Sequence, residues 1–121
     1  MKTVLIIDDN EAFRCLLAEF FSHRGFCPIA AESGGEGFEK AQAHRPDIIF
    51  CDVNMPEKNG FEVLKLIRHN EQTAKIPFFL MTAEPHMNNQ QQAEADGLIK
   101  KPIDLDELNE ILVSCPYPLK G

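Results

Sequence analysis

The chain has 121 residues, of which 44% are hydrophobic, and this length and composition are expected of one globular domain. Its 19 acidic and 12 basic residues give a formal net charge of −7, which argues against direct binding to nucleic acid or to an anionic membrane. No segment approaches the roughly 18 consecutive apolar residues of a transmembrane helix, and the N-terminus lacks a signal-peptide pattern. We therefore expect a soluble cytoplasmic protein.

The cysteines indicate a reducing compartment rather than a disulfide framework. No two of them form a C-x-x-C pair, and none stands with histidine at a zinc-binding spacing. We expect reduced thiols that mostly fill the core. The four residues are Cys15, Cys27, Cys51 and Cys115.

The first half of the chain alternates between strand and helix patterns. The apolar run at 4–7 predicts a strand buried on both faces. Apolar residues at helical spacing from Ala12 to Phe21 predict a helix, capped by Asp9 or Asn10 and ended by Gly25. The next expected elements are a weak strand at 28–30, a helix at about 33–44 and a strand at 48–52.

The second half continues the alternation. Its expected elements are a helix at about 60–68, a strand at 78–81, a polar helix near 85–95 and a short strand at 98–99. A last helix begins at Asp104, where Asp104 and Glu107 fit a capping box. Its predicted buried residues are Leu105, Leu108, Ile111 and Leu112. Because two prolines follow, we expect one domain over residues 1–114 and a short tail over 115–121.

Five strands alternating with five helices predict an α/β fold with a parallel sheet and helices on both faces. The most apolar strands, at 4–7, 48–52 and 78–81, should be central. The strand that carries Pro28 and the brief strand at 98–99 should be edges. With the strands numbered in chain order, their expected order across the sheet is 2-1-3-4-5. This is the flavodoxin-like doubly wound topology, whose functional crevice lies at the carboxyl ends of the strands.

Polar residues follow four of the predicted strands at these carboxyl ends. Taken one at a time, each could be a helix cap, a turn residue or a surface lysine. Such roles give no reason for all of them to share one edge of the sheet, so we interpret them together as a site. The polar residues are Asp8, Asp9, Asp52, Asn54, Thr82 and Lys101, and Ala83 follows Thr82.

The chemistry of this set favours phosphoryl transfer. Three clustered carboxylates repel one another, which raises at least one pKa unless a cation binds, and oxygen ligands suit Mg²⁺ or Mn²⁺. We expect Asp9 and Asp52 to bind the metal directly and Asp8 to act through water. Phosphoryl transfer depends mainly on positioning and charge neutralisation, which Lys101 and the Thr82 hydroxyl can supply. Asp52 is then the nucleophile that forms an acyl phosphate.

Four segments together resemble the receiver domain of two-component response regulators. They are I-I-D-D-N at 6–10, R-P-D-I-I-F-C-D-V-N-M-P-E-K-N-G-F-E-V at 45–63, M-T-A at 81–83 and K-P at 101–102. The resemblance extends over about residues 3–114. No single motif is decisive, but their order and spacing at the strand ends are specific.

The resemblance implies a role for each site residue. Asp52 accepts phosphate from a sensor histidine kinase or a phosphotransfer protein. It also implies the following: Asp8 and Asp9 as the metal pair, the Asn54 backbone carbonyl as a further ligand, Thr82 as the switch hydroxyl beside Ala83, Lys101 as the lysine that senses phosphate, Asn54 and Glu84 as positions that tune phosphate hydrolysis, and a peptide bond before Pro102 that is often cis. The protein promotes its own phosphorylation and dephosphorylation but turns over no independent substrate.

The chain departs from the family near its C-terminal end. Leu98 and Ile103 stand where the family usually has aromatic residues, and the stretch from Thr82 to Lys101 is shorter by roughly one helical turn. The polar helix near 85–95 is either short and solvated or a segment that orders on phosphorylation. We still expect the output surface to combine this helix, the strand at 98–99 and the last helix. A weak homodimer through that surface stays open, and the output partner is unknown.

Three alternatives belong to other functional classes. A haloacid-dehalogenase-like phosphatase would have a general acid at position 54, where this chain has Asn54. An FMN carrier would have phosphate-binding residues in place of D-D-N-E at 8–11. A degenerate receiver would act as a phosphorylation-independent interaction module, and the complete set of site residues argues against it.

Overall fold

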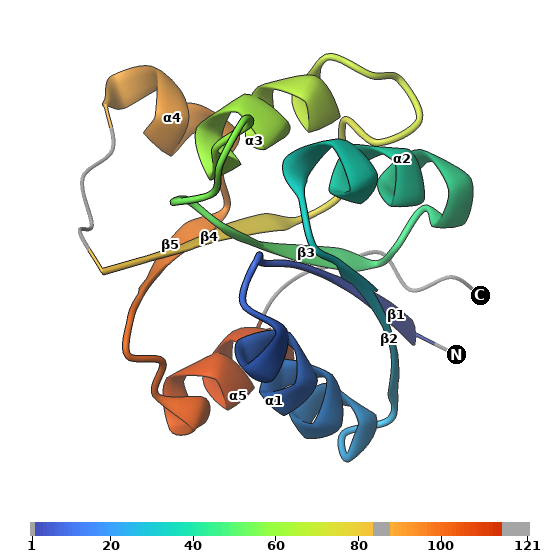
Figure 1. Ribbon diagram of the computed structural model, residues 1–121, viewed down its shortest axis with the longest axis vertical. Coiled ribbons are helices and arrows are strands. Elements are labelled where there is room, and N and C mark those ends of the chain that lie inside the picture. Colours follow the sequence, from blue (N-terminus) through green and yellow to red (C-terminus); the bar gives the residue numbers. More distant parts are fainter. Residues whose placement is uncertain (1, 84–87, 115–121) are drawn as a thin grey trace.

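The computed structural model describes residues 2–83 and 88–114 and forms the predicted doubly wound fold. A five-stranded parallel sheet has the order β2-β1-β3-β4-β5, as expected. One helical layer, α1 and α5, covers one face, and α2, α3 and α4 cover the other (Figure 1). The elements are β1 (Lys2–Ile7), α1 (Glu11–Ser22), β2 (Phe26–Ala31), α2 (Gly34–His44), β3 (Ile48–Asp52), α3 (Gly60–Arg68), β4 (Phe78–Thr82), α4 (Asn89–Glu94), β5 (Gly97–Lys100) and α5 (Leu105–Ser114).

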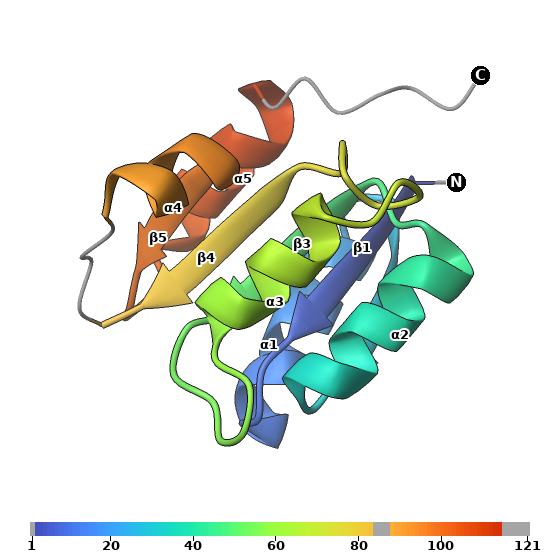
Figure 2. The same ribbon diagram turned by 90° about the horizontal axis from the view of Figure 1, so that it is seen from above.

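The three central strands are apolar and buried because helices cover both of their faces. Every residue of β3 and β4 is buried, as are the last four residues of β1. The edge strands β2 and β5 are more exposed. All five strands run the same way, so their carboxyl ends lie along one edge of the sheet, as the arrowheads in Figure 2 show.

Two hydrophobic cores lie on opposite faces of the sheet. The first is built from α1, α5 and the strand residues that face them, and Phe21, Phe50 and Phe79 stack across it. The second is built from α2, α3 and the alternate strand residues, among them Leu5 and Leu80. Both cores fix the strands, and therefore the strand ends, in place.

Side-chain caps set where most helices begin. The Asn10 side chain accepts a hydrogen bond from the Phe13 N–H, so Asn10 rather than Asp9 caps α1. Ser33 caps α2, and Asn59 forms a capping box with Glu62 at the start of α3. Each cap satisfies a backbone donor that has no partner within its helix.

Two C-terminal helices differ from the prediction. Asn88 caps α4, so this helix begins at Asn89 rather than near residue 85; residues 85–87 lie outside the described residues. The Asp104 carboxylate accepts a hydrogen bond from the N–H of Asp106 at 2.9 Å, one position before the donor that a capping box uses. Asp104 thus caps α5 in a different geometry.

Several apolar residues predicted to be buried are exposed. On α1 and α5, Leu16 is 51% exposed and Leu105 is 40% exposed. Cys15 and Cys27 are exposed as well, so the prediction of mostly core-filling thiols holds only for Cys51 among the described cysteines. Helical spacing identified the correct side of each helix, but it does not show how much of that side a neighbouring element covers.

No helix within residues 2–83 and 88–114 combines the length and hydrophobicity needed to cross a bilayer.

Candidate functional site

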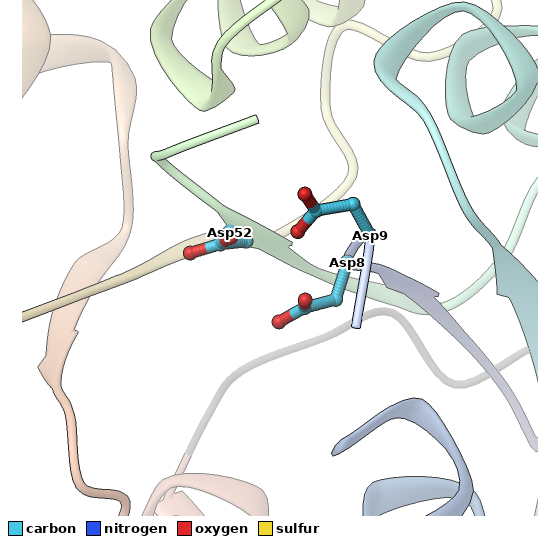
Figure 3. A group of neighbouring side chains, drawn as sticks. All are labelled: Asp8, Asp9 and Asp52. Atoms are coloured by element: carbon cyan, nitrogen blue, oxygen red, sulfur yellow. The ribbon is translucent and has the colours of Figure 1, made fainter. Parts of the chain in front are cut away.

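The ends of β1 and β3 bring three carboxylates together. Ile7 pairs with Cys51 in the parallel ladder, so the residues that follow or end these strands lie side by side. Carboxylate oxygens of Asp8, Asp9 and Asp52 lie within 4.8 Å of one another. Figure 3 shows the three carboxylates pointing to the same side. We call this group the acidic pocket.

Asp8 is held by the start of α1. Its side chain is fully buried, and its Oδ1 accepts a hydrogen bond from the Asn10 N–H at 2.9 Å. Arg14 donates from Nη1 to the Asp8 backbone carbonyl at 2.7 Å. The residues that begin the helix therefore also orient the first carboxylate of the pocket.

Asp52 is held by the close approach of α3. A Cβ atom added to Gly60 would lie 2.5 Å from the Asp52 carbonyl oxygen and 2.9 Å from the Cα of Val53. Only glycine fits this approach without a shift of the backbone. The Gly60 N–H also donates to the Val53 carbonyl at 2.9 Å, which fixes the loop after β3 against the start of the helix.

Lys101, the residue after β5, brings a positive charge to the pocket. Its Nζ lies 3.1 Å from Asp8 Oδ2 and 3.1 Å from Asp52 Oδ1. Its backbone N–H donates to the Thr82 carbonyl at 2.8 Å, so the end of β4 positions the residue after β5. Thr82 itself is buried, with 2% of its surface exposed.

The electrostatics of the pocket favour binding of a further cation. Burial raises the pKa of Asp52, the Asp8 carboxylate raises it further, and the Lys101 ammonium and the Asn54 N–H only partly offset this rise. Burial lowers the pKa of Lys101, but its contacts with Asp8 and Asp52 outweigh burial, so the net shift is upward. The lysine therefore stays charged, whereas the ionised form of Asp52 is less favourable in the pocket than in water.

The donor set fits a divalent metal ion. Three carboxylates and one ammonium meet in the pocket, so its acidic groups outnumber the lysine. Asp9 is exposed, so one side of the cluster is open to solvent. Mg²⁺ prefers oxygen ligands and keeps several bound waters, and a partly open carboxylate cluster meets both requirements.

The structure describes all but one of the remaining predicted residues. Asn54 and Ala83 are exposed, and Leu98 is partly buried against the second core. The Lys101–Pro102 peptide bond is cis. Glu84 lies outside the described residues.

Sequence reasoning missed two contributors to the site. Arg14 was not distinguished from other polar residues on α1, and no local pattern shows that its guanidinium reaches back to Asp8. Phe13 was predicted only as a core residue, yet its ring also lies 4.5 Å from the Lys101 ammonium. Both contacts connect elements whose relative placement the sequence does not state.

The buried thiol beside the pocket is not suited to act as a nucleophile. Burial, and then the Asp52 and Asp8 charges, hold the pKa of Cys51 well above its usual value. A protonated thiol is a weak nucleophile. Cys51 therefore serves as a core residue of β3.

Comparisons with known proteins agree with this geometry. The model of the response regulator receiver domain family matches residues 4–113. The polar-differentiation response regulator DivK of Brucella ovis is 31% identical over 116 residues, which cover 93% of this chain and 94% of that protein. The Regulator of RpoS of Escherichia coli is 34% identical over 122 residues, which cover 97% of this chain but 35% of that protein. The chain thus spans about a third of that relative's length.

A solved structure shows the same fold. The response regulator TrrA of Thermotoga maritima, crystallised in complex with Mg²⁺ and BeF, superposes with a TM-score of 0.84 at 31% identity, covering 93% of this chain and 97% of that one. The chain therefore belongs to the response regulator receiver domain family, a signalling domain of two-component systems. Receiver domains bind Mg²⁺ in an acidic pocket, and this chain has a cluster of three aspartates. This family differs from the phosphatase and FMN-carrier alternatives.

Proposed function

We propose that the protein is a phosphoacceptor receiver domain in which Asp52 is phosphorylated in a metal-dependent reaction. The carrying observation is the placement of one ammonium, Lys101 Nζ, 3.1 Å from both Asp8 and Asp52 within a cluster of three carboxylates. A pocket in which carboxylates outnumber the ammonium repels a phosphoryl group until a cation binds. Metal dependence follows from this charge.

In the transfer step, an Asp52 carboxylate oxygen attacks the phosphorus of a phosphohistidine. The P–N bond breaks, and its electron pair stays on the imidazole nitrogen of the partner. Asp9, Asp52 and the Asn54 backbone carbonyl would hold Mg²⁺ or Mn²⁺ directly and Asp8 would act through water, and the ion would supply positive charge to neutralise the carboxylates and the phosphoryl oxygens. Lys101 and the Thr82 hydroxyl contact the other phosphoryl oxygens.

The same residues promote loss of the phosphate, so the protein turns over no independent substrate. Asn54 and Glu84 tune the hydrolysis of the phosphate. The phosphodonor is a sensor histidine kinase or a phosphotransfer protein, and the reaction takes place in the cytoplasm.

The signal leaves through the surface of α4, β5 and α5. Phosphorylation adds about −1.5 to −2 charge, and the Thr82 hydroxyl then moves toward the phosphate. Because Thr82 ends β4 and its carbonyl binds the Lys101 N–H, its displacement acts on β5 as well. Leu98 replaces an aromatic switch residue, so the output does not use aromatic rotation. The output partner binds this surface, which can also form a weak homodimer.

Incubation with Mg²⁺ and acetyl phosphate, followed by intact-mass measurement, tests the proposal. The wild-type protein should gain the mass of one phosphoryl group, and Asp52→Asn should not. Asp106→Asn is a matched control, because it removes an exposed carboxylate on α5 and should leave the gain intact. Absence of the gain in the wild-type protein would favour a phosphorylation-independent interaction module.

A further inference from the structure

The Lys101 ammonium has a third neighbour besides the two carboxylates. Its Nζ lies over the ring of Phe13, 4.5 Å from the ring centroid. A cation within about 6 Å of an aromatic face is attracted by the ring quadrupole. Phe13 belongs to α1 and Lys101 follows β5, so this contact joins two elements on either side of the acidic pocket.

Phe13 is held in place by contacts other than the one with Lys101. Its N–H donates to the Asn10 side chain at 3.0 Å in the helix cap, and its side chain packs, partly buried, against the first core. The ring also lines a groove of about 470 Å³ together with Leu16, Ile103 and others. The ring is therefore anchored independently of the lysine that it faces.

Lys101 needs such an anchor because lysine is flexible. Its four-carbon stem has many rotamers, and its ammonium acts as a point charge without directional preference. The lysine side chain is 26% exposed, so solvent competes for the ammonium. Its ion pair with Asp52 holds it only until that carboxylate reacts.

We propose that Phe13 is a positioning residue that keeps the Lys101 ammonium at the acidic pocket before and after phosphorylation. Formation of the acyl phosphate converts the Asp52 carboxylate, and the Lys101–Asp52 ion pair must be replaced by a contact with a phosphoryl oxygen. The attraction of the Phe13 ring does not depend on the state of Asp52. The ring therefore holds the ammonium within reach of the phosphoryl group throughout the reaction.

This inference rests on the proposed phosphorylation of Asp52, and a double-mutant cycle tests it. Acetyl phosphate with Mg²⁺ serves as the phosphodonor, so that no partner protein has to dock, and the rate of the mass gain is measured. Phe13→Leu should lower the rate about fivefold, the size expected for loss of a partly buried cation–π contact. Phe13→Tyr keeps an aromatic face and should retain most of the rate.

Phe13→Leu in a Lys101→Met background tests whether the ring acts through the ammonium or only through packing. In Lys101→Met, which lacks the ammonium, Phe13→Leu should lower the residual rate no further. Arg24→Met is the matched control, because Arg24 lies 3.7 Å over the Phe20 ring at the other end of α1, and its loss should leave the rate unchanged. An equal reduction in both backgrounds, or an unchanged rate in Phe13→Leu alone, would overturn the proposal.

A second measurement distinguishes failure of this inference from failure of the proposed function. If the wild-type protein gains no phosphate, the proposed function is wrong, and the cycle is measured by urea unfolding instead. A coupling between Phe13→Leu and Lys101→Met in the unfolding equilibrium then supports Phe13 as the residue that positions the ammonium. Additive effects would show that the ring does not hold it.

Discussion

The acidic pocket and helix α4 are held in different ways. At the ends of β1 and β3, buried packing fixes the acidic pocket: Asp8 is fully buried, Asp52 is 5% exposed, and Gly60 lies against the Asp52 backbone. The six-residue helix α4 is instead tied at its C-terminal end, by a hydrogen bond from the Arg68 side chain to the Glu94 carbonyl.

Arg68, the last residue of α3, connects the end of α4 to the residues before β4 and β5. Its Nε donates to the Glu94 carbonyl at 2.7 Å, its Nη1 donates to the Ile76 carbonyl at 2.7 Å, and its Nη2 donates to Asp96 Oδ2 at 2.8 Å. The same carboxylate oxygen accepts the Phe78 N–H at 2.7 Å. The C-terminal end of α4 is thus tied to α3 and to the start of β4.

This contrast indicates a division of roles. Close packing does not deform continuously, so the β1–β3 end is suited to hold reacting groups at fixed distances. A short helix with few apolar side chains has little hydrophobic packing to lose, and such elements are typical of the parts that shift in a switch. The following substitutions test this contrast.

Gly60→Ala should have the largest effect, because the added Cβ would meet the Asp52 and Val53 backbones. We expect a loss of about 3 kcal/mol in the free energy of unfolding, the upper range for overpacking, measured by urea denaturation. Gly35→Ala is the matched control: its Cβ would meet nothing within 4 Å, and it lies in α2, where alanine should add about 0.5 to 1 kcal/mol. A tolerated Gly60→Ala would contradict the view that packing fixes the acceptor.

Arg68→Met should have the next largest effect and should act locally. The substitution removes the hydrogen bonds to three backbone carbonyls and to Asp96, and charged hydrogen bonds are worth about 1.5 to 3 kcal/mol each. Because these groups are partly solvated, we expect a net loss of about 2 kcal/mol. Amide exchange should accelerate in α4 and β5 more than in β1 and β3.

Lys65→Met, on an exposed position of the same helix, should change neither stability nor exchange measurably. If Arg68→Met accelerated exchange uniformly across the sheet, the acidic pocket and α4 would not be held independently of each other.

Asp52→Asn should have the smallest effect, and its sign depends on pH. The pKa of Asp52 is raised in the folded protein, first by burial and then by Asp8. A carboxyl group with a raised folded pKa contributes stability below its unfolded pKa and loses that contribution as the pH rises through the folded value. At pH 7 the ionised carboxylate is therefore unfavourable, and in metal-free buffer Asp52→Asn should raise the melting temperature.

The gain should disappear below the ordinary aspartate pKa of about 3.9, because wild-type Asp52 is then protonated as well. Addition of Mg²⁺ should stabilise the wild-type protein more than the variant, since binding to the folded state stabilises it by mass action, and EDTA should reverse this difference. Asp106→Asn should show neither effect. A destabilised Asp52→Asn at pH 7 would mean that the Lys101 contact outweighs burial.

Local patterns were sufficient for most of the fold. Continuous apolar runs identified the buried strands, and Pro28 together with the brevity of the strand at 98–99 placed the edges correctly. The boundaries of α4 and the exposure of Leu105 were wrong. A short polar helix has little hydrophobic periodicity to mark its ends, and the exposure of a helix face depends on which element covers it.

The sequence by itself determined the order of the strands and the edge of the sheet at which the carboxylates gather, because the side-chain period and the parallel connections leave few other arrangements. Only the tertiary structure decided three contacts. The Lys101 ammonium lies 3.1 Å from two carboxylates, the Phe13 ring lies beside it, and Arg68 donates to the carbonyl at the end of α4. These contacts join residues up to 93 positions apart. No local pattern encodes them, because they arise when two helical layers close on one sheet.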